Sequence, residues 1–132
     1  MWTYSQTTGA LAHNGDPAGV GYSGFEAGLN DPASEGIPDV GPIPAGNYTF
    51  GAVLPIGPGH TGVFVIPLVP DTLTRAKIII LGRGPDSFFC HGDTASDVVL
   101  HLELASRGCI IASRVIREAI ALSIDKQLMV TI

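Results

Sequence analysis

The sequence predicts a mainly β domain, a twisted mixed sheet or sandwich with one clear α-helix near the C-terminus. Seventeen glycines and ten prolines, concentrated before residue 70, indicate many turns, and only 14% of the 132 residues are charged. Short apolar stretches lie between those turns, and only one stretch has clear helical periodicity. The length is that of one domain, which we expect to span residues 1–132.

The first half of the chain has the pattern of short strands joined by turns. Residues 1–25 contain apolar stretches interrupted by turn sequences such as Asn14-Gly15, which predicts a meander or hairpin. Residues 26–46 are dense in Gly, Pro, Asp and Asn without a sustained period, so we expect a long loop. Residues 47–54 and 61–69 flank the turn-rich sequence PIGPGH and predict a hairpin with a longer connection.

The second half contains the predicted centre of the sheet and the helix. Residues 76–82, AKIIILG, predict a buried central strand, and residues 87–92 a short strand. The spacing over residues 113–123 predicts a helix capped by Ser113. Its expected apolar face consists of Val115, Ile116, Ala119 and Ile120, with Arg114, Arg117 and Glu118 on the polar side. Residues 127–132 alternate in polarity and predict a final strand.

Composition argues against several classes of partner. The formal net charge is −5, the isoelectric point is about 5.1, and the seven basic residues are spread singly, so we expect no nucleic-acid partner. Every apolar run is far shorter than the roughly 20 residues of a membrane span, so we expect no membrane insertion. The N-terminal sequence lacks the features of a secretory signal, which predicts synthesis in the cytoplasm without a signal peptide.

The sequence SRGC at residues 106–109 is the first candidate for chemistry. A cysteine becomes an acylation catalyst when a base or positive charge activates it and backbone N–H groups face the oxyanion. Gly108 permits close backbone approach, and a turn at 106–109 could present its N–H groups outward. Arg107 could add positive potential. Cys109 is therefore a candidate nucleophile, and the alternative is a buried structural thiol.

His91 is the strongest candidate for the partner base. It ends a predicted strand just before Gly92, where scaffolds often present functional groups. Because neighbouring residues on a strand point to opposite faces, Cys90 then faces the core, which disfavours both Cys90 as nucleophile and a Cys90–Cys109 disulfide. We expect both cysteines to be free thiols. The remaining histidines, His13, His60 and His101, have the pattern of loop or surface residues.

These residues resemble a known enzyme family. HGD at 91–93, followed by SRGC at 106–109, resembles the signature of the L,D-transpeptidase (YkuD-like) superfamily. Five stretches together resemble its type VI secretion L,D-transpeptidase effector (Tlde) family of peptidoglycan-attacking toxins. They are YSQTTGAL, GVGYSGF, GLNDPASEGIPDVGPIPAGNYTF, LGRGPDSFFCHGD and ASRGCIIASRVIREAI, and they extend over nearly the whole chain. The resemblance implies a YkuD-like fold.

The resemblance also implies a role for each residue. Cys109 would attack the carbonyl that follows meso-diaminopimelate in a tetrapeptide stem and expel the terminal D-alanine. His91 would act as base and then as acid, and the backbone of Gly108 and Cys109 would form the oxyanion hole. Ser106 would help to order the turn or the substrate. Water as acceptor gives L,D-carboxypeptidase activity, and a free D-amino acid gives exchange. No metal or other cofactor is implied.

The substrate contacts are less defined by the resemblance. Asp93, Arg107, Arg114 and Arg117 are the candidates for substrate binding. Many superfamily members have a second histidine where this chain has Arg107, and often an arginine where it has Ile111. Either a backbone carbonyl or Asp93 could orient His91.

The expected partners are peptidoglycan stem peptides, D-amino acids and an immunity protein, with secretion into the periplasm of a target cell. Two alternatives from other functional classes remain. A metal hydrolase could use His91, Asp93, His101 and Cys109, although their spacing is no established zinc pattern. A catalytically silent wall-binding or interaction module would retain the fold and lack the chemistry.

Overall fold

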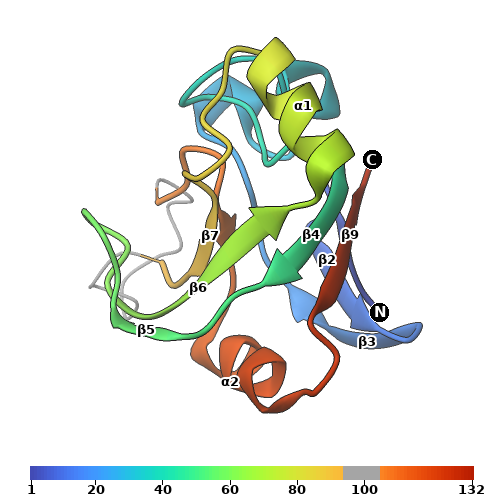
Figure 1. Ribbon diagram of the computed structural model, residues 1–132, viewed down its shortest axis with the longest axis vertical. Coiled ribbons are helices and arrows are strands. Elements are labelled where there is room, and N and C mark those ends of the chain that lie inside the picture. Colours follow the sequence, from blue (N-terminus) through green and yellow to red (C-terminus); the bar gives the residue numbers. More distant parts are fainter. Residues whose placement is uncertain (94–104) are drawn as a thin grey trace.

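The computed structural model, which describes residues 1–93 and 105–132, contains a curled mixed sheet and two α-helices (Figure 1). The described strands are β1 (Trp2–Ser5), β2 (Ala10–His13), β3 (Asp16–Val20), β4 (Gly46–Phe50), β5 (Leu54–Ile56), β6 (Val63–Pro70), β7 (Phe89–His91), β8 (Ile110–Ile111) and β9 (Gln127–Thr131). Their order in the sheet is β3-β2-β1-β9-β4-β6-β7-β8, and β5 pairs with β6. The mainly β class that the sequence predicts is confirmed.

The N-terminal strands form the predicted meander. β1, β2 and β3 pair antiparallel in succession. Asn14 and Gly15 both have positive φ, 51° and 85°, as the tight turn between two twisted strands requires. The final strand β9 is inserted between β1, to which it is parallel, and β4, to which it is antiparallel. The C-terminal strand therefore joins the meander to the rest of the sheet.

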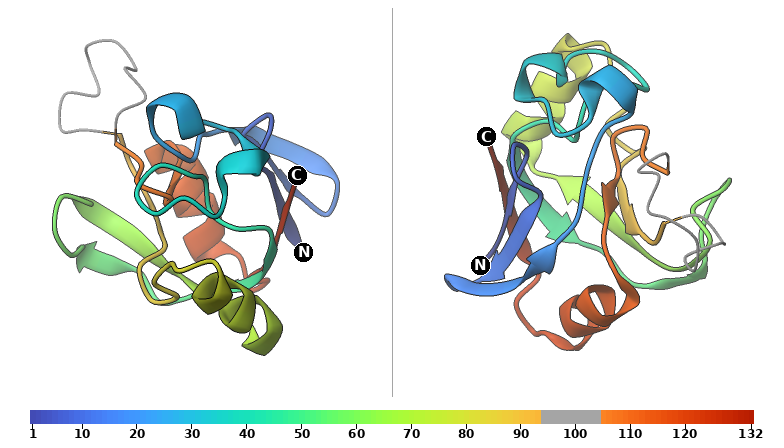
Figure 2. Two further views of the ribbon diagram at one scale, coloured as in Figure 1. Left: turned by 90° about the horizontal axis from the view of Figure 1, so that it is seen from above. Right: turned by 180° about the vertical axis from the view of Figure 1, so that it is seen from behind.

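The sheet curls until the segment after β3 meets β8, at the opposite end of the strand order. Tyr22 and Ile111 form an antiparallel bridge in which each amide N–H donates to the other's carbonyl, with N···O distances of 3.0 and 2.8 Å. The right-hand view of Figure 2 shows the blue segment that follows β3 running beside the orange segment that carries β8. This bridge places Tyr22 beside the segment that carries Cys109.

The predicted hairpin of residues 47–54 and 61–69 is found only in part, because the first predicted strand is divided into β4 and β5. Both strands pair antiparallel with β6. β5 pairs with residues 63–65 of β6, and β4 pairs with residues 68–70, so the two ends of β6 have different partners. Residues 26–46 are mostly irregular, as expected, with two short 3₁₀ turns at Glu26–Gly28 and Pro32–Ser34.

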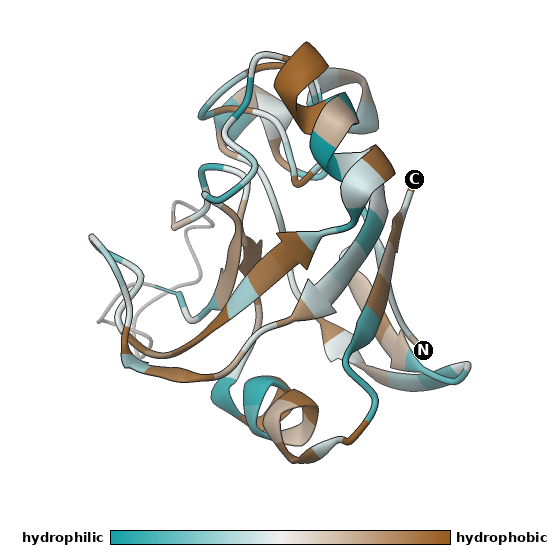
Figure 3. Cartoon of the chain, viewed as in Figure 1, coloured by the Kyte–Doolittle hydropathy of each residue, from teal (hydrophilic) through white to brown (hydrophobic). Residues whose placement is uncertain are grey.

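The prediction of a buried central strand at 76–82 is wrong, because this segment belongs to a helix, α1 (Thr72–Ile80). Asp71 caps it: the Oδ1 atom accepts a hydrogen bond of 2.8 Å from the amide of Thr74. Ile78 is fully buried, whereas Ile79 and Ile80 are 58% and 84% exposed. The apolar run comes from isoleucines at the C-terminal end of the helix (Figure 3), so continuous hydrophobicity here does not indicate burial on two faces.

The predicted C-terminal helix corresponds to α2 (Arg114–Leu122), and Ser113 Oγ accepts from the amide of Ile116 as its cap. Its buried face differs from the prediction. Val115 is 75% exposed, while Arg117 is buried and donates to backbone carbonyls. The expected single helix is thus one of two α-helices in the described part of the chain. Nowhere in residues 1–93 and 105–132 is a helix long and apolar enough to cross a membrane.

Two groups of buried apolar residues lie on opposite faces of β7 and β8. Cys90 and Ile110 belong to the main core, with most of the large buried side chains of the sheet and of α2. Cys109, Ile111 and Tyr22 form a smaller cluster, packed against by Leu29, Phe89 and Ala105. The predicted orientation of Cys90 toward the core is confirmed, and both thiols are free.

The isoleucines of α1 provide a test of its register. Ile78→Ala should lower the free energy of unfolding by about 3 kcal/mol, because it removes a fully buried side chain. Ile80→Ala should change it by less than about 0.5 kcal/mol, because Ile80 is exposed. Urea denaturation of both variants is the measurement. Equal losses would contradict the helix, since residues 78 and 80 share one face only in a strand.

Candidate active site

Parallel pairing of β7 with β8 brings the two principal candidate residues onto one face of the sheet. Cys90 is opposite Ile110 and His91 is opposite Ile111. Paired residues of adjacent strands share a face, so His91 lies on the side of Ile111. Cys109 immediately precedes β8 and packs on that side with Ile111 and Phe89. His91 in β7 and Cys109, the residue before β8, are 18 positions apart in the sequence and lie on the same side of this strand pair.

The imidazole of His91 is buried, and its orientation is fixed by its own chain. Nδ1 lies 2.8 Å from the carbonyl oxygen of Gly92. A carbonyl can only accept, so Nδ1 carries the proton and Nε2 of the neutral ring holds the basic lone pair. Burial lowers the pKa of His91, the bond to Gly92 opposes this effect, and the positive charge of Arg117 adds to it. His91 is therefore neutral at pH 7, as a general base must be. Of the two orienting groups that the sequence left open, the backbone carbonyl holds Nδ1.

The thiol of Cys109 is 9% exposed, and its raised pKa keeps it protonated at pH 7. Burial raises the pKa of the thiol to about 11, while the amide of Phe89 and the charge of Arg83 act in the opposite direction. The thiol donates to the carbonyl oxygen of Ser87 over 3.7 Å. Within residues 1–93 and 105–132, no hydrogen bond joins this sulfur to the imidazole of His91. The two described residues Cys109 and His91 therefore lie on the same side of the strands without a hydrogen bond between them.

The turn before Cys109 is held by the hydroxyl of Ser106. This hydroxyl donates to the carbonyl of Cys109 at 2.6 Å and accepts from the amides of Gly24 and Gly108 at 2.9 and 3.1 Å. Ser106 is fully buried and so orders the turn rather than facing a substrate. The amide of Gly108, expected in the oxyanion hole, is directed into the turn. The amide of Cys109 is the remaining backbone donor for that role.

Gly108 is required by both its conformation and its surroundings. Its φ is +119°, a region that L-residues rarely adopt. A Cβ atom at this position would overlap Nη2 of Arg83 and approach Cε1 of Phe88 to 3.0 Å. The turn thus packs its glycine directly against a buried guanidinium.

Arg83 is a residue of the site that the sequence analysis did not identify. Its guanidinium donates to four backbone carbonyls, those of Glu35, Gly41, Pro42 and Arg107, at distances of 2.6 to 3.2 Å. It also lies 5.1 Å from the ring centroid of Phe88. The residue stands in LGRGPD, within one of the five stretches that resemble the Tlde family, but nothing in its spacing indicates a partner 24 positions away.

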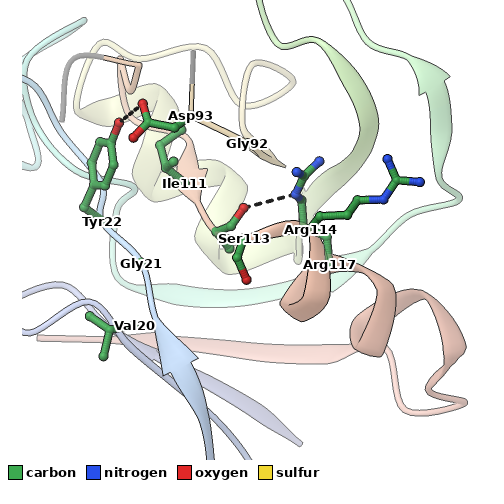
Figure 4. Close-up of a pocket in the computed structure, with 10 residues that line it drawn as sticks. Val20, Gly21, Tyr22, Gly92, Asp93, Ile111, Ser113, Arg114 and Arg117 are labelled. Atoms are coloured by element: carbon green, nitrogen blue, oxygen red, sulfur yellow. Dashed lines mark hydrogen bonds between the residues drawn. The ribbon is translucent and has the colours of Figure 1, made fainter. Parts of the chain in front are cut away.

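A pocket of about 490 Å³ opens beside the end of β7 and the start of α2 (Figure 4). Its lining comes from three segments: residues 20–22, residues 92–93, and residues 111–114 with Arg117. Tyr22 and Asp93 face each other there, and the hydroxyl of Tyr22 donates to Oδ1 of Asp93 at 2.9 Å. His91 and Cys109 do not line the pocket, but Gly92, which follows His91, and Ile111, which pairs with His91, do.

The four predicted substrate-binding residues are divided by the structure. Asp93, Arg114 and Arg117 line the pocket, so three of the four are brought together. Arg107 is exposed and lies 4.2 Å from the ring centroid of Phe25, outside the pocket lining.

The two pocket arginines differ in their freedom. Arg114 is half exposed, pairs with Glu118 at 2.9 Å and stacks 4.1 Å from the ring centroid of Phe64. Arg117 is buried and donates to the carbonyls of Ala112, Val63 and Phe64 at 2.7 to 3.1 Å. Arg117 therefore anchors backbone at the base of the pocket, and Arg114 is the arginine that can turn toward a ligand.

In the part of the chain that the structure describes, no three His, Cys, Asp or Glu side chains converge as a metal site. His101, a ligand of the alternative metal-hydrolase hypothesis, lies outside the described residues. Comparison of the sequence with models of known families and with curated proteins finds no match.

The packing of Gly108 against Arg83 predicts a steric requirement. Gly108→Ala should lower the free energy of unfolding by more than about 2 kcal/mol, because it adds a clash to a strained φ. Gly62→Ala is the matched control: φ is +84° there, but nothing lies near its Cβ position, so about 1 kcal/mol is expected. Thermal and urea unfolding measure both. Equal losses would contradict the close contact with Arg83.

Proposed function

We propose that this protein is a cysteine-dependent acyl-transfer enzyme acting on peptidoglycan, an L,D-carboxypeptidase and L,D-transpeptidase with a YkuD-like fold. Its substrate would be the tetrapeptide stem, from which it removes or exchanges the D-alanine that follows meso-diaminopimelate. The proposal combines the resemblance of five sequence stretches with the arrangement of the described residues.

The observation that carries the proposal is the register of β7 and β8. It puts His91 on the side of β7 and β8 where Cys109, the residue before β8, also packs, and Nε2 of His91 is the basic nitrogen. A nucleophile, a base and a group that orients the base are the three parts such a reaction needs. The carbonyl of Gly92 is the orienting group.

The reaction would proceed in two steps. The thiol of Cys109 gives its proton to Nε2 of His91 as sulfur bonds to the carbonyl carbon. The C–N bond to D-alanine then breaks, His91 returns the proton to the leaving amine, and a thioester forms. In the second step, water or the amine of a free D-amino acid attacks the thioester carbonyl and gives a proton to His91. The C–S bond then breaks, and His91 returns that proton to the sulfur, which restores the thiol.

The pocket beside β7 supports this substrate class. The D-centre of meso-diaminopimelate carries both an amino and a carboxylate group, and the pocket contains both Asp93 and Arg114. Opposite charges across a pocket of this size suit a zwitterionic group. Arg107, above the ring of Phe25, would act at most on a more distant part of the substrate.

The biological setting follows from the resemblance. An effector of this kind would be made in the cytoplasm, exported by a type VI secretion system and act in the periplasm of a target cell. Cleavage or exchange of stem termini there weakens wall cross-linking. The producing cell would require an immunity protein that blocks the site.

A second candidate function is a catalytically silent wall-binding or interaction module. One observation favours it: Cys109 is nearly buried, protonated and bonded to Ser87 rather than to His91. These are the properties of a structural thiol. The pocket with Asp93 and Arg114 would then serve binding alone.

Mass spectrometry of muropeptides tests the proposal. Incubation with the protein should remove terminal D-alanine from tetrapeptides, and added D-methionine should replace it in part. Cys109→Ala should abolish both products, because it removes the nucleophile. Cys90→Ala is the matched control and should retain activity, because Cys90 faces the main core on the opposite side of the strand.

Two outcomes would contradict the proposed reaction. One is an unchanged muropeptide profile with folded wild-type protein; retained binding to sacculi would then support the silent module. The other is equal product from wild type and Cys109→Ala.

The burial of His91 predicts where kcat/KM falls at low pH, the acid limb of its pH profile. Burial disfavours the protonated ring, so the pKa of His91 lies below its ordinary value of 6.5 and the base persists into mild acid. The value of kcat/KM should therefore fall by half only below pH 6.5. A limb centred above pH 6.5 would contradict a buried His91 as the base.

Arg117→Gln should move the acid limb to higher pH, because it removes a positive charge that opposes protonation of His91. Arg114→Gln is the control within the same pocket. It should raise KM and leave the limb in place, since Arg114 does not contribute to the pKa of His91.

A further inference from the structure

Arg83 is a buried cation without a carboxylate partner among the described residues. It is 8% exposed, and all four of its hydrogen bonds go to neutral backbone carbonyls. No salt bridge within residues 1–93 and 105–132 includes it. The nearby carboxylate of Glu35 is bound instead by Lys77, at 2.8 Å. Burying a charge without a counter-charge is unfavourable, so such a residue calls for an explanation.

The guanidinium lies against the turn that presents Cys109. Nη2 donates to the carbonyl of Arg107 at 3.2 Å and occupies the space where a Cβ of Gly108 would be. Its other bonds reach residues 35 and 41–42, so it ties this turn to the long loop. The same loop region is joined to the turn by Ser23, whose hydroxyl donates to Gly108 and accepts from the amide of Ile43.

We propose that Arg83 is a positioning residue of the Cys109 site, whose fixed positive charge behind the turn favours the thiolate. The role in catalysis rests on the proposed function, whereas the effect on the thiol does not. An arginine suits this place because its planar fork holds several carbonyls at once and it remains charged when buried. In the resting protein the guanidinium has no anionic partner among the described residues. We assign that role to the thiolate that Cys109 forms when it loses its proton.

Other titratable groups around Cys109 cannot supply the same charge. His91 lies on the side of β7 where Cys109 packs, but it is neutral when it acts as the base. Tyr22 donates its hydroxyl to Asp93, so this pair offers no positive charge. Cys90 is on the opposite face of β7. Arg107 is exposed, and its guanidinium lies over Phe25.

Alkylation of Cys109 by iodoacetamide measures the effect without any substrate. At pH 8.5, well below the pKa of about 11, the rate is proportional to the thiolate fraction. Peptide mapping by mass spectrometry separates Cys109 from Cys90. Arg83→Gln and Arg83→Met should slow alkylation of Cys109 about tenfold, equivalent to one pKa unit. Arg83→Lys, which keeps the charge, should remain within about threefold of wild type.

Two controls separate charge from loosened structure. Arg117→Gln also removes a buried arginine that holds backbone carbonyls, but at the other end of the site. Arg75→Gln removes an exposed arginine paired with Asp86. Both should leave the rate at Cys109 within about twofold. Loosening of the turn would expose the thiol and accelerate alkylation, so slower alkylation cannot arise from loosening.

Each result decides the assignment. Unchanged or faster alkylation in a folded Arg83→Gln or Arg83→Met variant overturns it. An equally slow Arg83→Lys variant also overturns it, because the fork and not the charge would then matter; this comparison with wild type stands even if the uncharged variants do not fold. Slower alkylation in a protein that leaves muropeptides unchanged upholds the role of Arg83 and rejects the proposed reaction.

Discussion

The parallel pairing of β7 with β8 is the constraint on which the site depends. Strands that pair in parallel need a long connection, and β7 and β8 are separated by residues 92–109. Their pairing puts His91 on the side of the sheet where Cys109 packs. The pairing is secured from the other side by the bridge between Tyr22 and Ile111, which also draws the curled sheet together. Tyr22 then donates to Asp93 and accepts from the amide of Ala105, so one side chain joins both flanks of the site. The contacts of Tyr22 that close the curled sheet are therefore also contacts that hold the candidate site together.

Buried polar groups give the Cys109 turn its rigidity. The hydroxyls of Ser23 and Ser106 and the guanidinium of Arg83 have almost every partner in the backbone, and a buried polar group is tolerable only when it is bonded. Each bond contributes about 1 kcal/mol net, but leaving one donor or acceptor unpaired costs about 1–3 kcal/mol. The network therefore admits few alternative arrangements of the turn. Such a turn can hold backbone amides in place before a substrate arrives, which is what electrostatic stabilisation of an oxyanion requires.

The same burial that fixes the site opposes its chemistry. Low polarity raises the pKa of Cys109 and lowers that of His91, so both groups are neutral at pH 7. A neutral thiol beside a neutral imidazole matches a mechanism in which the proton moves during attack. It does not match a preformed ion pair. In the proposed reaction, the hydrogen bond between Cys109 and Ser87 would have to break before the sulfur attacks a substrate carbonyl.

The sequence by itself determined the mainly β class, the N-terminal meander, the helix after Ser113 and the opposite faces of Cys90 and His91. These follow from local rules: turn residues, capping and the period of two along a strand. The strand predicted at residues 76–82 is wrong, because a run of isoleucines suits a strand and the end of a helix equally. The capping residue Asp71 is the sequence feature that indicates the helix. Only the tertiary structure decided that Arg117 is buried, that Arg107 lies away from the pocket and that Arg83 supports the turn. The buried roles of Arg117 and Arg83 depend on backbone carbonyls of distant segments. Every residue has such a carbonyl, so the sequence does not show which of them an arginine will bind.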